Sequence, residues 1–277
     1  MLRFENPIDT KFEELRSERE SALIAYLTGG DPDTRSFIAN SKAIVDAGAD
    51  ILEIGMPFSD PIADGPIIQA SSNRALLQVT TLDRIFYATQ RLATTCKVPI
   101  VLLTYYNPIL AMGIEDFLSR ARRAGINGLV IPDLPVGEED YFSEVAMSKY
   151  GIDKICLVAP NTSALRLQRI IRQSKGFLYF ISLYGVTGPR DHISPHALEA
   201  LRQLKKLSNS SIPLCAGFGV SKPEQVRSLV NSGADGVIVG SALVRIVAAN
   251  LDKPERALDE LKHAVRSFKN ATSRSSM

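Results

Sequence analysis

One unit recurs along this chain of 277 residues and constrains its fold more than any other feature. An amphipathic segment ends in glycine, a small or polar residue follows, and a short run rich in valine, isoleucine and leucine begins. Glycine just past a helix end is typical where the backbone must adopt a positive φ. Such short apolar runs indicate strands buried on both faces. Four copies are DAGADILEIG (46–55), RAGINGLVIPD (123–133), KYGIDKICLVAP (149–160) and NSGADGVIVGS (231–241).

Four further runs bring the predicted strands to eight; they span residues 21–27, 99–104, 177–182 and 212–216. The segments between strands predict helices over 35–47, 81–95, 114–124, 138–150, 163–174, 195–207 and 222–231, with two more at 242–248 and 254–268. Strands that alternate with helices form a parallel sheet. Eight such units in about 250 residues predict an α/β fold, the closed (β/α)8 TIM barrel, as one domain over residues 1–277. An open, doubly wound sheet is the structural alternative.

Two terminal segments lie outside this repeat. Residues 10–17 predict an extra N-terminal helix that covers the bottom of the barrel. The polar tail, residues 270–277, is expected to fray.

Composition and charge exclude several classes of function. The net charge is +2 with no long block of one sign, so a nucleic-acid-binding face is not indicated. No apolar run reaches the ~18 residues that span a bilayer, and the charged N-terminus lacks the apolar core of a secretion signal. Cys96, Cys156 and Cys215 are widely spaced, which argues against disulfides and zinc and suggests that the last two are core residues. We expect a cytoplasmic protein.

The second predicted strand carries a carboxylate inside an apolar run. In ILEIG (51–55), Glu53 shares one strand face with Ile51 and Gly55, near the carboxyl end, where barrel enzymes keep their chemistry. If that face points inward, burial would raise the pKa of Glu53 and let it act as acid and base. The competing interpretation is a glutamate that caps a loop or pairs with an arginine.

The loop after this strand, MPFSDPIADGP (56–66), is long and stiffened by proline and glycine. Long ordered loops at this end of a barrel usually carry function, which makes Asp64 a candidate. Asp60 and Asp64 precede proline and glycine, however, and aspartate there is also ordinary turn chemistry. Position alone does not separate the two interpretations.

Glycine-bearing loops follow three later strands and predict a phosphate site. They are YGVTG (184–188), AGFGVS (216–221) and GS (240–241), the last opening a helix. Glycine lets backbone N–H groups approach an anion, and a helix N-terminus adds favourable potential. In many barrels the loops after the seventh and eighth strands bind phosphate. Tight turns without a ligand remain the alternative.

The sequence lacks the residues that Schiff-base and metal-dependent reactions need at the barrel mouth. Lys97, Lys154 and Lys175 lie just before strands and not at their carboxyl ends, which disfavours a Schiff-base aldolase. The histidines His192, His196 and His263 show no metal-ligand spacing, so no metal site is expected. The chemistry is left to carboxylates, hydroxyls and the backbone.

Over nearly its whole length the sequence resembles the tryptophan synthase α subunits. The similarity rests above all on LEIGMPFSDPIADGPIIQAS (52–71), supported by YLTGGDPD (26–33), TYYNPI (104–109), GLVIPDLP (128–135), YGVTG, AGFGVS and VIVGSALV (237–244). That family is a lyase of L-tryptophan biosynthesis, which cleaves indole-3-glycerol phosphate to indole and glyceraldehyde 3-phosphate by a retro-aldol reaction. The resemblance therefore implies this activity.

The resemblance also implies roles for individual residues. Glu53 would be the acid/base and Asp64 would take the indole N–H. Tyr179 matches a tyrosine that contacts the glutamate, and Thr187 a threonine that orients the aspartate. The phosphate cradle would be Gly188, Gly219, Gly240 and Ser241. The indole pocket would be Tyr26, Ile68, Leu103, Val130, Phe218 and Ile238, all of which core packing could also explain.

A partner follows from the same resemblance. The family works in an α2β2 heterotetramer, in which the β subunit holds pyridoxal phosphate and receives indole, whereas the α chain has no cofactor. Candidate interface residues are Met56, Pro57, Asp60, Asn107, Pro108, Asp133 and Pro135, where turn geometry is the competing interpretation. The segment 189–192, PRDH, has no counterpart that we could match.

Three alternatives stay open at the level of sequence. The first is the same lyase working alone and releasing free indole. The second is another phosphate-handling barrel, such as a sugar-phosphate isomerase, against which the Glu53–Asp64 loop argues. The third is a non-catalytic barrel that binds a phosphorylated ligand, against which the presence of Glu53, Asp64, Tyr179 and Thr187 argues.

Overall fold

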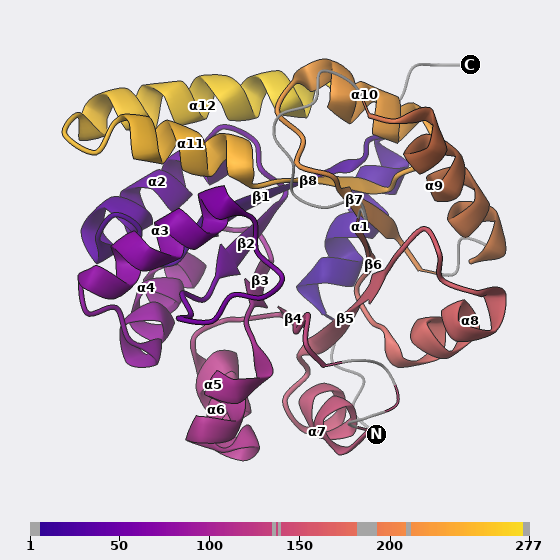
Figure 1. The fold of residues 1–277 in the computed structure, drawn as a ribbon, viewed down its shortest axis with the longest axis horizontal. Coiled ribbons are helices and arrows are strands. Elements are labelled where there is room, and N and C mark those ends of the chain that lie inside the picture. Colours follow the sequence, from indigo (N-terminus) through magenta and orange to yellow (C-terminus); the bar gives the residue numbers. More distant parts are fainter. Residues whose placement is uncertain (1–5, 135–136, 138–139, 182–192, 209–211, 274–277) are drawn as a thin grey trace.

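The computed structural model describes residues 6–134, 137, 140–181, 193–208 and 212–273. Eight parallel strands close into a barrel in chain order, and helices surround it (Figure 1). The closed TIM barrel is thereby confirmed and the open sheet is excluded. The strands are β1 (Ala22–Thr28), β2 (Ile51–Gly55), β3 (Ile100–Leu103), β4 (Gly128–Val130), β5 (Asp153–Val158), β6 (Leu178–Ile181), β7 (Leu214–Gly217) and β8 (Gly236–Val239).

Twelve helices lie in the described residues. They are α1 (Pro7–Ser17), α2 (Thr34–Asp46), α3 (Pro66–Leu77), α4 (Leu82–Thr95), α5 (Tyr106–Met112), α6 (Ile114–Arg123), α7 (Asp140–Lys149), α8 (Ala164–Gln173), α9 (Pro195–Leu207), α10 (Pro223–Asn231), α11 (Ser241–Ala249) and α12 (Pro254–Asn270). α3 and α5 were not predicted from the sequence. None of the helices in these ranges is long and apolar enough to cross a membrane.

The glycines of the recurring unit end helices as the sequence predicts. Gly48, Gly125, Gly151 and Gly233 follow α2, α6, α7 and α10, and each has a positive φ. A residue with a Cβ would be strained there, so glycine lets the chain leave the helix and enter the next strand.

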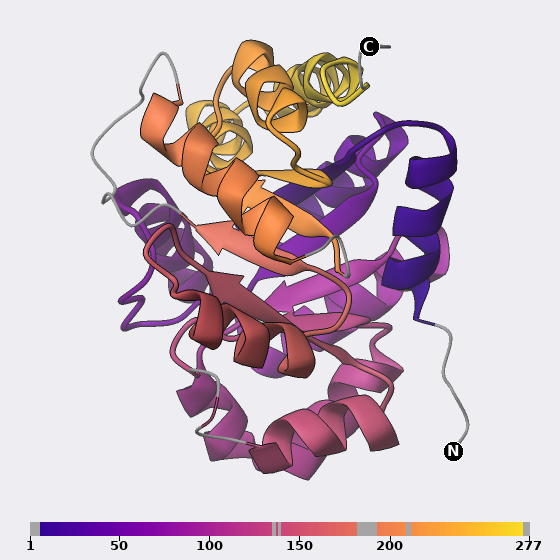
Figure 2. The same cartoon turned by 90° about the vertical axis from the view of Figure 1, so that its right-hand side faces the viewer.

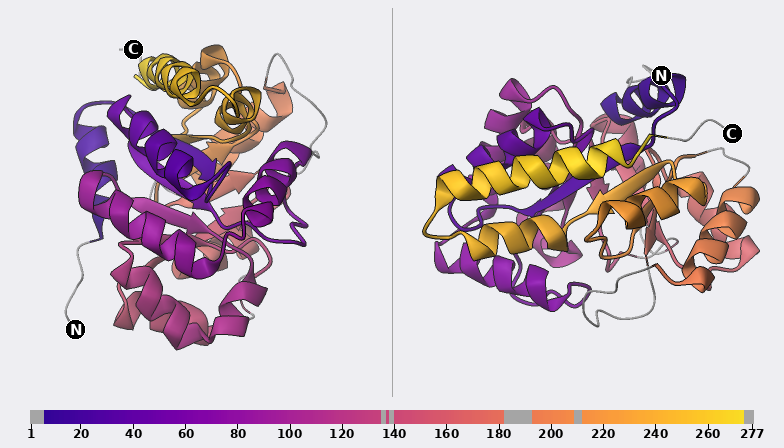
Figure 3. Two further views of the ribbon diagram at one scale, coloured as in Figure 1. Left: turned by 90° about the vertical axis from the view of Figure 1, so that its left-hand side faces the viewer. Right: turned by 90° about the horizontal axis from the view of Figure 1, so that it is seen from above.

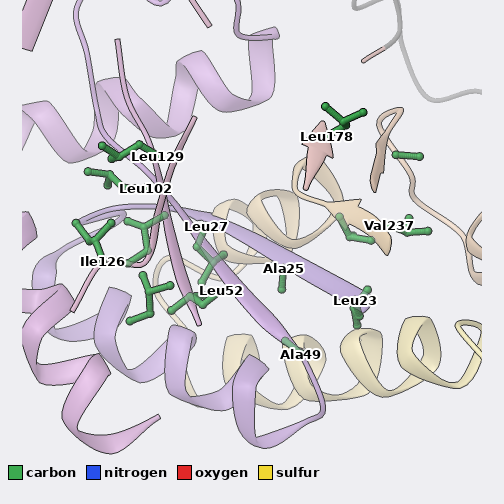
Figure 4. Packing of buried hydrophobic residues seen from close by; sticks show 14 of the residues in the cluster. Leu23, Ala25, Leu27, Ala49, Leu52, Leu102, Ile126, Leu129, Leu178 and Val237 are labelled. Carbon is green, nitrogen blue, oxygen red and sulfur yellow. The ribbon is translucent and has the colours of Figure 1, made fainter. Parts of the chain in front are cut away.

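Two apolar layers follow from the alternation of side chains along each strand. Leu52 and Ile54 of β2 point outward into the large cluster between strands and helices, part of which Figure 4 shows. Ile51 points inward, into a smaller cluster that fills the barrel. Period-two alternation in a barrel predicts this division.

The N-terminal helix closes one end of the barrel (Figure 2). Ile8, Phe12 and Leu15 of α1 belong to the interior cluster, which confirms the predicted cover. The helix begins at Pro7 rather than at residue 10. Asn6 caps it by accepting a hydrogen bond from the Ile8 N–H at 3.0 Å, and proline at the first position fits the helix geometry.

The first part of the polar tail is packed, contrary to the expected fraying. α12 continues to Asn270 and lies beside α11 (Figure 3), and Ala271 and Thr272 are buried. Ser273 forms an antiparallel bridge with Glu20. The backbone N–H of Ser21 donates to the Thr272 carbonyl at 3.1 Å, so the end of the chain is tied to the start of β1.

Candidate active site

Glu53 stands inside the barrel near its carboxyl end. Like Ile51, it lies on the inward face of β2, and only 1% of the residue is exposed. In the register of the sheet, Glu53 pairs with Tyr26 of β1 and with Val101 of β3. The sequence left open whether the face with Glu53 points inward or outward, and in the structure it points inward.

Neither competing interpretation of Glu53 fits its surroundings. Within the described part of the chain, both carboxyl oxygens are buried without a hydrogen-bond partner and no ion pair reaches them. Burial raises the pKa of Glu53 to about 8, and the negative charge of Asp64 contributes to the rise. A carboxyl group of this kind is protonated at neutral pH and can deliver a proton.

Asp64 approaches Glu53 from the loop over the barrel mouth. Its N–H donates to the Pro61 carbonyl at 3.1 Å, and its own carbonyl accepts from the Gln69 side chain at 2.8 Å. Burial raises the pKa of Asp64 to about 6, while a hydrogen-bonding interaction with Tyr105 lowers it. Asp64 is thus mostly ionised at neutral pH, where Glu53 is mostly protonated.

Two tyrosines line the same space. Tyr26 is buried, and its hydroxyl lies 3.4 Å from that of Thr28, which contacts the Ser71 hydroxyl of α3 at 2.5 Å. A Cβ at Gly55 would overlap the Tyr26 hydroxyl, so glycine is needed there. Tyr179 of β6 interacts electrostatically with Glu53, although no hydrogen bond joins the two side chains within the described ranges.

The remaining indole-pocket candidates lie in three places. Leu103, Val130 and Ile238 belong to or pack against the interior cluster, on the same side of the sheet as Glu53. Ile68 is half-buried on α3, directly after the Asp64 loop. Phe218 lies just after β7, with its ring edge-to-face on Phe180 at 4.9 Å, so it also packs against the outer cluster.

The described part of the predicted phosphate cradle lies at the ends of β7 and β8. Gly219 is exposed with a φ of +65°, and a Cβ there would meet no atom of the described residues within 4 Å. Gly240 is the N-cap residue of α11, which Ser241 begins, and no side chain in the described part of the chain caps this helix. A Cβ at Gly240 would press on the Tyr26 ring at 3.2 Å. Thr187, Gly188 and Pro135 lie outside the described residues.

The candidate interface residues differ in exposure. Asp60 and Asn107 are exposed, and Asp60 accepts from the Ser59 hydroxyl at 2.5 Å. Pro108 and Asp133 are half-buried; Met56 and Pro57 are buried and leave little surface for a partner. Both carboxylate oxygens of Asp133 accept from the Tyr106 N–H, at 3.0 and 3.1 Å, which gives Asp133 a local role at the start of α5.

Sequence reasoning missed two features of the mouth. Tyr105 follows β3 and accepts a hydrogen bond from the Ala63 N–H at 3.0 Å; its place just after a strand was the available signal. A cavity of about 300 Å³ opens at the carboxyl ends of β5 and β6. Its lining residues, for which the sequence held no comparable signal, are Leu157, Val158, Ala159, Asn161, Thr162, Arg166, Ile170 and Ile181.

Among the described residues, those for other chemistries do not gather at this end. Lys154, expected before its strand, is instead the second residue of β5, and it is buried near the amino end of that strand. In the described ranges no three His, Cys, Asp or Glu side chains are grouped so as to hold a metal ion. Cys156 and Cys215 are buried, as expected of core residues.

The family model of the tryptophan synthase alpha chain matches residues 12–273. The chain belongs to this family. A tryptophan synthase alpha chain of Methanoregula boonei is 46% identical over 252 residues, covering 91% of this chain and 94% of that protein. One of Arabidopsis thaliana is 40% identical over 260 residues, with coverages of 94% and 93%.

Solved structures of the family share the fold. The crystal structure of the tryptophan synthase alpha chain of Legionella pneumophila subsp. pneumophila superposes with a TM-score of 0.88 at 33% identity, covering 98% of this chain and 99% of that one. A structure of Mycobacterium tuberculosis tryptophan synthase gives a TM-score of 0.87 at 33% identity, with coverages of 97% and 98%. The resemblance seen in the sequence is thereby confirmed.

Proposed function

We propose that the chain cleaves indole-3-glycerol phosphate to indole and glyceraldehyde 3-phosphate, as a cytoplasmic lyase of L-tryptophan biosynthesis. Membership of the tryptophan synthase alpha chain family supports this activity. The observation that carries the mechanism is the pair Glu53 and Asp64, two carboxyl groups at the barrel mouth whose pKa values are about 8 and about 6. Two carboxyl groups in unequal environments can hold different protonation states at one pH.

The reaction needs two proton transfers that one group can perform in turn. Protonated Glu53 gives its proton to indole C3, and the resulting carboxylate takes the proton of the side-chain hydroxyl. The bond between C3 and the side chain then breaks, and its electron pair restores the indole ring while the aldehyde forms. Ionised Asp64 accepts a hydrogen bond from the indole N–H, whose positive charge increases when C3 is protonated.

The rate should therefore depend on pH in a bell shape. Below the pKa of Asp64, about 6, protonation removes the acceptor of the indole N–H. Above the pKa of Glu53, about 8, loss of its proton removes the acid. Measuring kcat/KM for indole release between about pH 5 and pH 9 checks both limbs. Asp64→Asn should lose the acidic limb; if that limb persists, another group causes it.

The phosphate would bind at the ends of β7 and β8, against Gly219, Gly240 and Ser241 and, outside the described residues, Gly188. The N-terminus of α11, which no described side chain caps, points its N–H groups out of the helix, and backbone donors of this kind suit an anion. Gly219 has a positive φ, and the described residues around it leave room for an anion to approach its backbone closely.

Gly219→Val should weaken binding of substrate and of glycerol phosphate alike, by roughly tenfold or more, because the side chain fills the space the phosphate needs. Isothermal titration calorimetry with glycerol phosphate measures the loss. Gly113→Val is the matched control, since Gly113 also has a positive φ, +88°, and no described atom within 4 Å of its Cβ position. Equal losses in both variants would assign the effect to backbone strain, and loss of indole affinity alone would contradict the placement.

We further propose that the chain acts in an α2β2 heterotetramer with a β subunit that carries pyridoxal phosphate. The exposure of Asp60 and Asn107 at the barrel mouth is compatible with such a partner. The deciding experiment is indole release from indole-3-glycerol phosphate by the purified chain, with and without the β subunit. Slow release that rises with the partner supports both proposals. Fast release that the partner leaves unchanged supports a lyase working alone, and no indole in either case refutes the activity.

A further inference from the structure

Tyr105 is a buried tyrosine at the barrel mouth that the mechanism above does not use. It lies between β3 and α5, and only 1% of it is exposed. Its hydroxyl accepts a hydrogen bond from the backbone N–H of Ala63 at 3.0 Å. Ala63 directly precedes Asp64, so the hydroxyl reaches the loop next to the carboxylate proposed to take the indole N–H.

The backbone on both sides of Tyr105 is fixed to the barrel. The Thr104 N–H donates to the Val130 carbonyl of β4 at 3.0 Å. The Tyr106 N–H donates to the Asp133 carboxylate. The Tyr105 ring packs on Phe58 of the Asp64 loop, with centroids 5.2 Å apart. A side chain supported at backbone and ring can hold a second element within a fraction of an ångström.

Within the described residues, the middle of the loop that carries Asp64 has few connections of this kind. The Ile62 N–H donates to the Asp60 carbonyl at 2.9 Å and the Asp64 N–H to the Pro61 carbonyl at 3.1 Å. These bonds shape the loop but do not attach it to the barrel. The side chain of Ile62 is 81% exposed, and Ala63 is exposed as well. The bond between Ala63 and Tyr105 links this exposed turn to the end of β3.

We propose that Tyr105 is a positioning residue of Asp64: its hydroxyl holds the backbone at Ala63 against the end of β3 and thereby aims the Asp64 carboxylate at the indole N–H. The inference rests on the proposed function and adds to it a residue that acts through Asp64. A phenol hydroxyl can accept one hydrogen bond while donating another. Tyr105 can therefore hold Ala63 and donate to Asp64 together.

The charges around Asp64 allow this contact to be measured. Among the described residues, four titratable side chains interact with the Asp64 carboxylate: Glu53, Tyr26, Tyr179 and Tyr105. Of these, Tyr105 is the one whose hydrogen-bonding interaction lowers the pKa of Asp64 against the effect of burial. Removing the Tyr105 hydroxyl should therefore raise the pKa of Asp64.

The test is Tyr105→Phe, which keeps the ring on Phe58 and removes only the hydroxyl. The pKa of Asp64, followed by carboxyl-carbon NMR and assigned with Asp64→Asn, should rise by about one unit, the size expected for one lost hydrogen bond to a charged group. The acidic limb of the kcat/KM profile should move up with it, while the Glu53 limb stays in place. At neutral pH, kcat/KM should fall about tenfold.

Two further variants separate positioning from a general structural effect. Tyr87→Phe removes the hydroxyl of a tyrosine on α4 that is 55% exposed, and should change neither pKa nor rate. In an Asp64→Asn background, Tyr105→Phe should cost less than about twofold, because the group it positions is already gone. An unchanged Asp64 pKa, or the same fold loss in both backgrounds, overturns the proposal. If the unmodified chain released no indole, the proposed function would fail, while the NMR titration would still decide whether Tyr105 holds Asp64.

Discussion

Replacing Glu53 by glutamine is expected to lower the rate of indole release by roughly 10³-fold, the usual contribution of a positioned acid/base. The amide has the shape of the carboxyl group but cannot give up or take back the transferred proton. Binding of glycerol phosphate should be unchanged, because the proposed phosphate site is formed by other strands. Steady-state kinetics together with calorimetry separates the two effects.

The same substitution should leave the fold at least as stable. The Glu53 carboxyl is buried without a hydrogen-bond partner among the described residues, and its pKa is raised from 4.5 to about 8. When the pKa of a carboxyl group is higher in the folded state than in the unfolded state, its contribution to stability is complete at pH values below the unfolded pKa. This contribution is lost as pH rises through the folded pKa. Measured by urea unfolding, the free energy of unfolding of the unmodified chain should fall as pH rises between those two values. In Glu53→Gln this fall should be smaller.

A matched control is Glu255→Gln on α12, which replaces an exposed glutamate far along the chain from the site. It should change neither the rate nor the pH dependence of unfolding. Turnover by Glu53→Gln within about tenfold of the unmodified chain would remove Glu53 from the role of acid/base. A large loss of stability would instead mean that the carboxyl group supports the fold.

Four of the eight strands could be predicted because each copy of the recurring unit carries its own signals, and the other four were predicted from their apolar runs. Gly48 and Gly233 mark a helix end by a conformation that glycine favours, and the apolar runs that follow are buried on both faces. Alternation along β2 then placed Glu53 on the face of Ile51, leaving only the choice between inward and outward. A local pattern was sufficient here because the structure it specifies is local.

The helices that the sequence did not predict lack that pattern. α3 buries Ser71, Ser72 and Ala75, so its packed face is made of small and polar residues without an apolar period. α5 has seven residues, too few for a period to show. The packing of the tail around Ala271 was not predicted for a related reason, because the residues that the tail contacts belong to the start of the chain.

The candidate site shows the same division. The type and position of Glu53 and Asp64 suggested chemistry, but their unequal pKa values come from burial and from neighbours on other elements. The role of Tyr105 depends on a contact between residues 42 positions apart, and no local pattern specifies such a contact. The burial of Met56 likewise follows from packing against other elements, and the sequence does not show it.

Arg74→Met is expected to cost about 3 kcal/mol of folding free energy, within the range for breaking a buried ion pair from one side. Arg74 of α3 holds the Asp31 carboxylate through two hydrogen bonds of 2.9 and 2.8 Å, and Asp31 is only 4% exposed. Without the guanidinium, a charge is left buried and unpaired. Urea unfolding at neutral pH measures the loss.

The pH dependence of this loss gives the mechanism a sharper test. Burial already raises the pKa of Asp31 although Arg74 lowers it, so removing Arg74 should raise the pKa further. A raised carboxyl pKa destabilises the folded state increasingly as pH rises above the unfolded value of 3.8. The loss of folding free energy caused by Arg74→Met should therefore be small at acidic pH and reach its full size near neutral pH. Adding Asp31→Asn to the Arg74→Met variant should restore part of the lost free energy.

Arg256→Met is the matched control, because Arg256 pairs with Glu260 on the surface of α12, with 64% and 37% of the two side chains exposed. Exposed pairs of this kind contribute less than about 1 kcal/mol. Equal losses from the two arginine variants would mean that the side chain of Arg74, and not its charge, matters. The larger loss at Arg74 would instead mean that this ion pair holds α3, and with it the end of the loop that carries Asp64, against the loop after β1.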